Sequence, residues 1–122
     1  MRRTYEGYVL LLFCEKMEVE RVEDFQVIDN CLMVKLPEEI DHYRSSYICE
    51  RADHFIVNQN VDHVVFDFEQ TQFMDSSGIG IILGRYKKIS CLGGKVYVLH
   101  PDKQIKRVLN LSGVSKLVEI VE

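Results

Sequence analysis

The chain has 122 residues, of which 47% are hydrophobic and 28% are charged, as is typical of one soluble globular domain. Its net charge of -4 gives no indication of the basic surface that nucleic-acid binding requires. The longest apolar run, from Tyr8 to Cys14, is far shorter than the about twenty residues of a membrane span. No small-residue cleavage site of a signal peptide follows it. We therefore expect a cytoplasmic protein that binds neither nucleic acid nor membrane.

Residues 1–24 differ in composition from the rest of the chain. The apolar run is followed by a charged stretch from Glu15 to Asp24, and neither part has a pattern that predicts a role. We therefore treat residues 1–24 as an N-terminal extension of unknown role and residues 25–122 as one domain. In an alternative interpretation, the native protein begins at Met17 and lacks the first sixteen residues.

The cysteines and histidines are scattered along the chain. Cys14, Cys31, Cys49 and Cys91 form no C-x-x-C pair, which favours free and mostly buried thiols in a reducing cytosol. Disulfides or a metal site are the less favoured alternatives. The four histidines also lack the spacing of metal ligands, so we expect neither a metal nor a cofactor.

The first half of the domain predicts two strands and a helix. Residues 25–28 and 31–36 read as the arms of a hairpin, because Asp29-Asn30 favours a tight turn between them. Pro37 ends the second strand, since proline donates no backbone hydrogen bond. Asp41 is a suitable N-cap for a helix that runs to about Phe55. The helical period predicts a buried face made of Tyr43, Tyr47, Ile48, Ala52 and Phe55. The charged residues expected to face water are Arg44, Glu50, Arg51 and Asp53.

The second half continues with a strand, a helix and a strand, in the order typical of a crossover between parallel strands. Residues 64–68 are apolar except for Asp67, which predicts a strand covered on both faces. The helix that follows Ser77 ends at Gly93-Gly94, and residues 95–99 form the next strand. The inward stripe of this helix is expected to contain Ile79, Ile82, Leu83, Tyr86 and Ile89.

Glycines mark two further features of the second half. Gly80 and Gly84 lie one helical turn apart, which predicts a close approach of their helix to a neighbouring element. Gly113 is a suitable C-cap for a final helix that begins near Asp102. The inward residues of that helix are expected to be Ile105, Val108 and Leu109. Residues 117–121 form either an edge strand or a tail docked on the core, and the whole pattern predicts an α/β domain.

The segment Asp75-Ser76-Ser77-Gly78 lies where a strand ends and a helix begins, an edge that ligands favour in α/β sheets. The N-terminus of a helix presents unpaired N–H groups and a partial positive charge, which stabilise an anion such as a phosphate carried on a serine. A phosphate adds a charge of about -1.5 to -2 at neutral pH, and beside Asp75 it would repel acidic groups of a docked partner. Alternatively, Ser76 or Ser77 serves only as an ordinary helix cap.

Signals for an enzyme are weaker. No histidine is near Ser76 in the sequence, and neither the G-x-S-x-G motif nor the phosphate-binding loop G-x-x-x-x-G-K-[ST] is present. Gly78-Ile79-Gly80 with Gly84 is similar to a dinucleotide-binding fingerprint, but it contains one residue too many and lies inside a helix. We therefore expect a protein that is not an enzyme.

Residues 73–87, which read FMDSSGIGIILGRYK, closely resemble the signature of STAS-domain anti-sigma factor antagonists of the stage II sporulation protein AA type. The resemblance extends from about Phe25 to the C-terminus and includes the segment Glu39-Ile40-Asp41-His42. It implies a STAS domain over residues 25–122. It also implies a mixed sheet of four to five strands with about four α-helices packed against it.

The resemblance further implies a regulator of transcription in sporulation. Such a protein binds an anti-sigma factor that is also a serine kinase, and thereby releases the sigma factor. The kinase phosphorylates the serine after the aspartate, here Ser76, which weakens the complex until a phosphoserine phosphatase restores it. The partner-binding residues implied at matching positions are Asp41, Asp75, Ser76, Ser77 and Gly78.

One position departs from the family pattern. The family usually has glycine where this chain has Glu38, so the turn before Asp41 must be built differently.

A second hypothesis is a STAS-like module without a switch, which senses a ligand or docks another protein.

Overall fold

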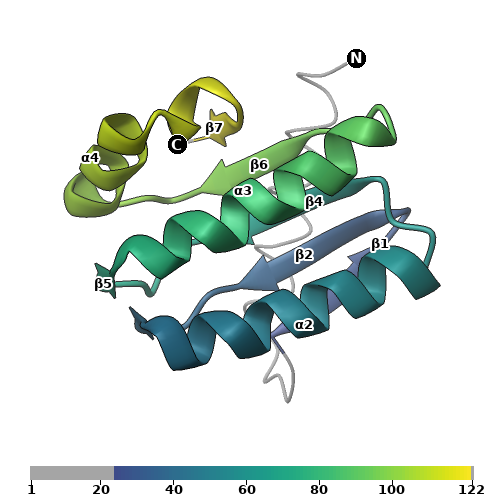
Figure 1. Ribbon diagram of the computed structural model, residues 1–122, viewed down its shortest axis with the longest axis horizontal. Coiled ribbons are helices and arrows are strands. Elements are labelled where there is room, and N and C mark those ends of the chain that lie inside the picture. The colour runs from purple at the N-terminus through teal and green to yellow at the C-terminus, as the bar shows by residue number, and fades with distance from the viewer. Residues whose placement is uncertain (1–23, 122) are drawn as a thin grey trace.

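The computed structural model describes residues 24–121. Its main sheet has five strands in the order β1-β2-β4-β6-β7, and only β1 runs antiparallel to its neighbour (Figure 1). The strands are β1 (Phe25–Ile28), β2 (Cys31–Lys35), β4 (His63–Asp67), β6 (Val96–Leu99) and β7 (Glu119–Val121). The predicted mixed α/β sheet is therefore confirmed. Of the two alternatives for the C-terminal segment, the edge strand is confirmed. Met17, the alternative start of the protein, and Cys14 both lie outside the described residues.

Local turn chemistry determines the hairpin of β1 and β2. Asp29 and Asn30 have φ angles of 52° and 67°, which is the left-handed conformation that a two-residue hairpin turn requires. Short polar side chains tolerate this conformation better than other non-glycine residues do. The predicted turn is therefore confirmed.

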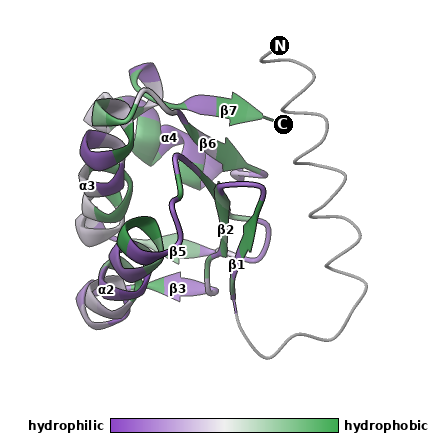
Figure 2. Ribbon diagram, turned by 90° about the vertical axis from the view of Figure 1, so that its right-hand side faces the viewer, coloured by the Kyte–Doolittle hydropathy of each residue, from purple (hydrophilic) through white to green (hydrophobic). Residues whose placement is uncertain are grey.

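Three α-helices occur in the described part of the chain, together with the 3-10 helix η1 (Val114–Lys116), where about four α-helices were expected. The α-helices are α2 (His42–Asn58), α3 (Ser76–Cys91) and α4 (Lys103–Ser112). They lie on one side of the main sheet (Figure 2) and share one core with it. None of these described helices is long and apolar enough to cross a membrane.

The two faces of the sheet carry different sets of buried side chains because successive residues of a strand point to opposite faces. Strand residues packed against the helices include Leu32, Val34, Val64, Phe66, Val96 and Val98. The opposite face holds a smaller buried cluster, made of Cys31, Met33, Val65, Tyr97 and Leu99. Residues 64–68 are buried throughout, as predicted.

The predicted buried face of α2 was partly wrong. Tyr43 and Tyr47 are 83% and 59% exposed, whereas the buried residues of this helix are Ser45, Ile48, Ala52 and Ile56. The apolar stripe is thus rotated away from the two tyrosines. Asp53, which was expected to face water, is half-buried and forms ion pairs with α3.

One further prediction was wrong, and another was correct in part. A Cβ atom added at Gly80 or Gly84 would meet no heavy atom within 4 Å, so neither glycine marks a close approach. Such an approach occurs instead at Gly94, where a Cβ would collide with the backbone carbonyl of Asp62. The three described cysteines are free thiols, as expected, and Cys31 is buried and Cys49 partly buried, but Cys91 is exposed.

Candidate functional site

A second, two-stranded sheet brings the starts of α2 and α3 together. Strand β3 (Glu39–Ile40) pairs in parallel with β5 (Phe73–Met74), and Ile40 lies opposite Met74. The backbone N–H of Asp75 donates to the carbonyl of Ile40 over 3.2 Å. Strands β3 and β5 lie side by side (Figure 2), so the residues that follow them, Asp41 and Asp75, are neighbours.

Asp75 is the N-cap of α3, and its carboxylate is held by Ser77. One oxygen accepts the backbone N–H of Ser77 at 2.8 Å and also a short hydrogen bond from the Ser77 hydroxyl. These bonds lower the pKa of Asp75, the hydroxyl having the largest effect and the N–H the next. Partial desolvation opposes this shift, while the charge of His42 and the N–H of Gly78 add to it. Asp75 is therefore a carboxylate at neutral pH.

The two serines at the start of α3 have different surroundings. Ser77 is half-buried, and its hydroxyl is engaged with Asp75. Ser76 is exposed, and its hydroxyl makes no hydrogen bond to another residue within the described part of the chain. The structure thus gives the capping role to Asp75 and Ser77 and leaves the Ser76 hydroxyl accessible to solvent.

Asp41 caps α2 in a similar way. Its side chain accepts the N–H of Arg44 at 2.8 Å and is exposed. One turn further along, the hydroxyl of the buried Ser45 donates to the carbonyl of Ser77 over 3.3 Å. This bond connects the first turns of the two helices and gives the buried hydroxyl a partner.

Gly78 has a structural place among the predicted site residues. It is buried, and a Cβ atom there would overlap the side chain of Met74. The absence of a side chain therefore lets the first turn of α3 pack on β5. The structure brings Asp41, Asp75, Ser76 and Ser77 together at one edge, with Gly78 beneath them.

The turn that contains Glu38 needs no glycine. The carbonyl of Glu38 accepts the N–H groups of Gln72 and Phe73 at 2.8 and 3.2 Å, and its φ angle is not in the positive region. The hydroxyl of Thr71 donates to the carbonyl of Pro37 over 2.8 Å. Hydrogen bonds to the 70–73 segment thus hold the turn in place.

Two features of this region were missed by the sequence analysis. Tyr43 and Phe73 expose 83% and 48% of their surface near the starts of α2 and β5, and exposed aromatic residues are frequent anchors in protein interfaces. In addition, the buried Arg85 of α3 forms a 3.0 Å ion pair between its Nε and Oδ1 of Asp53. A helical stripe begun at Ser45 instead of Tyr43 would have revealed the exposed tyrosine.

Comparisons with known proteins agree with this architecture. An anti-sigma F factor antagonist of Paenibacillus polymyxa is 38% identical over 91 residues, covering 75% of this chain and 78% of the relative. Unphosphorylated SpoIIAA, an anti-sigma factor antagonist, superposes with a TM-score of 0.67 at 26% identity over 80% of this chain and 87% of that chain. Bacillus SpoIIAA in the phosphorylated form gives 0.66 at 28% identity, over 80% and 91%.

A family model described as the STAS domain matches residues 24–122, which is most of the chain. The strand order and the relatives lead to the same assignment as the motif at residues 73–87. The chain therefore belongs to the STAS domain family, and it is a regulatory binding protein rather than an enzyme.

Proposed function

We propose that this protein is an anti-sigma factor antagonist whose binding is switched off by phosphorylation of Ser76. In the unphosphorylated form it binds an anti-sigma factor that is also a serine kinase, and thereby releases a sigma factor in the cytoplasm during sporulation. A phosphoserine phosphatase returns it to the binding form. One observation carries the proposal: Ser76 is the first residue of α3, and its exposed hydroxyl has no hydrogen-bond partner among residues 24–121.

The position of Ser76 suits a phosphate. Backbone N–H groups of the first turn of α3 and the helix dipole stabilise an anion there, so the domain is expected to remain folded after modification. The phosphate adds a charge of about -1.5 to -2 next to the carboxylate of Asp75. The surface offered to a partner therefore becomes strongly acidic without a change in fold.

The proposed partner surface contains Asp41, Asp75, Ser76 and Ser77. Both carboxylates cap helices, so hydrogen bonds to backbone N–H groups hold these two side chains in place. Fixed acidic groups suit a basic patch on the anti-sigma factor, and a dianion at Ser76 would disturb the geometry of that pairing. Gly78 contributes indirectly, because it lets α3 begin close to Met74.

We assign this function to the STAS domain, residues 25–122, and leave residues 1–24 as an extension of unknown role. The test incubates the full chain with the anti-sigma kinase of its own genome and ATP, followed by mass spectrometry of the modified peptide. We expect phosphate on Ser76, and none on that peptide in S76A. The matched control is S46A, which removes another exposed helical serine and should not change the modification.

Phosphate found only on Ser77, or nowhere on the chain, would contradict the switch. Binding of a partner that neither phosphorylates the chain nor responds to Ser76 substitutions would instead support the STAS module without a switch.

A further inference from the structure

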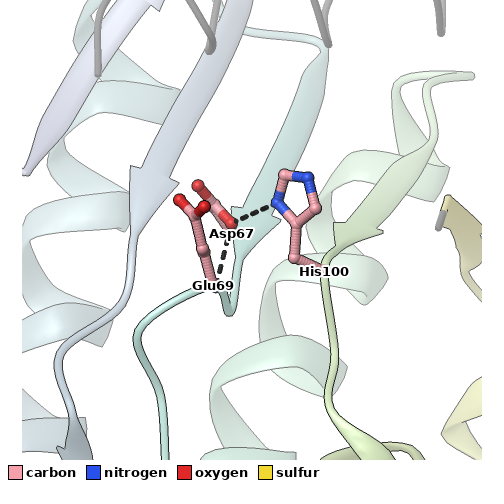
Figure 3. Close-up of side chains that lie close together, drawn as sticks. All are labelled: Asp67, Glu69 and His100. Atoms are coloured by element: carbon pink, nitrogen blue, oxygen red, sulfur yellow. Dashed lines mark hydrogen bonds and ion pairs between the residues drawn. The ribbon is translucent and has the colours of Figure 1, made fainter. Parts of the chain in front are cut away.

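Three potential metal ligands meet at the carboxyl edge of the main sheet, although one of them, His100, is far from the other two in sequence. Asp67 is the last residue of β4, Glu69 follows two residues later, and His100 comes directly after β6. One ligand atom from each lies within 4.8 Å of the others (Figure 3). Strands β4 and β6 are parallel neighbours, so their ends place Asp67 beside the residue that precedes His100.

Asp67 is an unusual residue in this cluster because it is fully buried, at 0% exposure. Its Oδ1 accepts the N–H of Glu69 at 3.0 Å and lies 3.0 Å from Nδ1 of His100. Its Oδ2 is buried and has no hydrogen-bond partner among residues 24–121. A buried carboxylate oxygen without a partner is costly, which points to a group that supplies one.

The charged side chains around Asp67 favour a bound cation. The two carboxylates of Asp67 and Glu69 lie close to each other in Figure 3, with the imidazole of His100 on the other side of Asp67. Lys35, opposite Asp67 in the register of β2 and β4, places its Nζ 3.8 Å from Oε1 of Glu69. Its ammonium thus offsets one carboxylate but makes no hydrogen bond to Oδ2 of Asp67.

We propose that Asp67, Glu69 and His100 bind one divalent transition-metal cation, with Zn²⁺ as the representative ion. The ligands would be Oδ2 of Asp67, a carboxylate oxygen of Glu69 and an unprotonated ring nitrogen of His100. A mixed set of imidazole and carboxylates suits Zn²⁺ and similar ions, whereas Mg²⁺ and Ca²⁺ prefer oxygen ligands alone. Three protein ligands leave at least one position of the cation for solvent.

This site is separate from the proposed switch. Asp67 follows Val65 by two residues in β4, so its side chain is on the sheet face opposite α2 and α3. Metal binding and Ser76 phosphorylation can therefore succeed or fail independently of each other.

The test uses the full chain, stripped of metal with a chelator and titrated with Zn²⁺ by calorimetry. We expect one Zn²⁺ per chain, and a loss of affinity of about tenfold or more in both E69Q and H100Q. The control is H54Q, which removes an exposed histidine of α2 and should bind as the wild type does. Since Glu69 and His100 are not buried, these two variants remain informative even if D67N does not fold.

A Co²⁺ titration distinguishes metal binding at this site from metal binding by cysteine thiols. Binding at Asp67, Glu69 and His100 should give visible absorption without the charge-transfer band of a thiolate ligand, and H100Q should abolish it. The proposal is overturned if the wild type binds no Zn²⁺, if E69Q and H100Q bind as tightly as the wild type, or if the Co²⁺ spectrum shows thiolate ligation.

Discussion

The helices α2 and α3 begin side by side and have the same kind of N-cap, but the two caps make different hydrogen bonds. Each follows a two-residue strand and is capped by an aspartate. Asp41 holds only a backbone N–H, that of Arg44, whereas Asp75 holds both the N–H and the hydroxyl of Ser77. The carboxylate that starts α3 is therefore the more firmly fixed of the two.

This difference explains how the exposed Ser76 hydroxyl can lie at a helix start without serving as its cap. A serine at such a position commonly serves as the cap itself, and its modification would then remove a capping bond. Here Asp75 and Ser77 together satisfy the helix start, and the Ser76 hydroxyl makes no hydrogen bond within the described part of the chain. The comparison of the two helix starts therefore predicts that Ser76 is dispensable for folding.

The largest expected effect concerns the ion pair that joins the two helices. R85A leaves Asp53 without the partner that is 3.0 Å away, and Arg85 is buried. We expect a loss of about 2–3 kcal/mol in the free energy of unfolding, below the value for a fully buried pair because Asp53 is partly exposed. Urea denaturation measures this loss. The control K88A, which removes the more exposed partner of Asp53, should cost about 0.5 kcal/mol or less, and equal losses would contradict the prediction.

The next effect compares the two caps directly. D75A removes the acceptor of two hydrogen bonds and D41A the acceptor of one. We expect D41A to lower the free energy of unfolding by about 1 kcal/mol, as is typical of N-cap substitutions, and D75A to lower it by more than D41A does. Equal losses in urea denaturation would show that the Ser77 hydroxyl adds nothing to the cap of α3.

A smaller effect is expected from S76D, which should change partner binding but not the free energy of unfolding. S76D places a negative charge where the phosphate would be, and we expect about tenfold weaker binding of the anti-sigma factor, or about 1.4 kcal/mol. The free energy of unfolding should change by about 0.5 kcal/mol or less, because an acid is tolerated at a helix start. S46D, an acid placed one turn into α2, is the control for net charge. If it weakens binding as much as S76D, the effect is not specific to α3.

Sequence patterns predicted the parts of this molecule that depend on local chemistry. The hairpin turn depends on the conformations that Asp29 and Asn30 themselves adopt. The burial of residues 64–68 follows from the apolar composition of that run. The order of strand, loop and helix around Asp75-Ser76-Ser77-Gly78 located Ser76 at a helix start. In each case the decisive interactions lie within a few residues of the chain.

The missed features depend on contacts between distant segments. Strands β3 and β5 have two residues each and exist because Ile40 pairs with Met74, which no local period reveals. Tyr43 was placed inward because apolar residues alone were counted, whereas the buried Ser45 is satisfied by the carbonyl of Ser77. Likewise, Asp67 and His100 meet only because β4 and β6 are neighbours.

The smallest expected effect is the pH dependence of the α3 cap. The pKa of Asp75 is lowered from the model-compound value of 3.8, chiefly by the Ser77 hydroxyl, so the unfolded chain binds this proton more readily than the folded one. The resulting stability is present above pH 3.8 and is lost as the pH falls through the folded-state pKa. In S77A the main cause of the shift is absent. The difference in free energy of unfolding between wild type and S77A should therefore shrink between pH 6 and pH 3, as measured by urea denaturation.

S76A is the matched control for this titration, because the Ser76 hydroxyl does not bond to Asp75. Its difference from the wild type should stay constant over the same pH range. A difference for S77A that does not change with pH would mean that its hydroxyl stabilises protonated and charged Asp75 equally. The two helix starts would then differ in hydrogen bonding but not in charge, and the fixed carboxylate beside Ser76 would lose its part in the proposed switch.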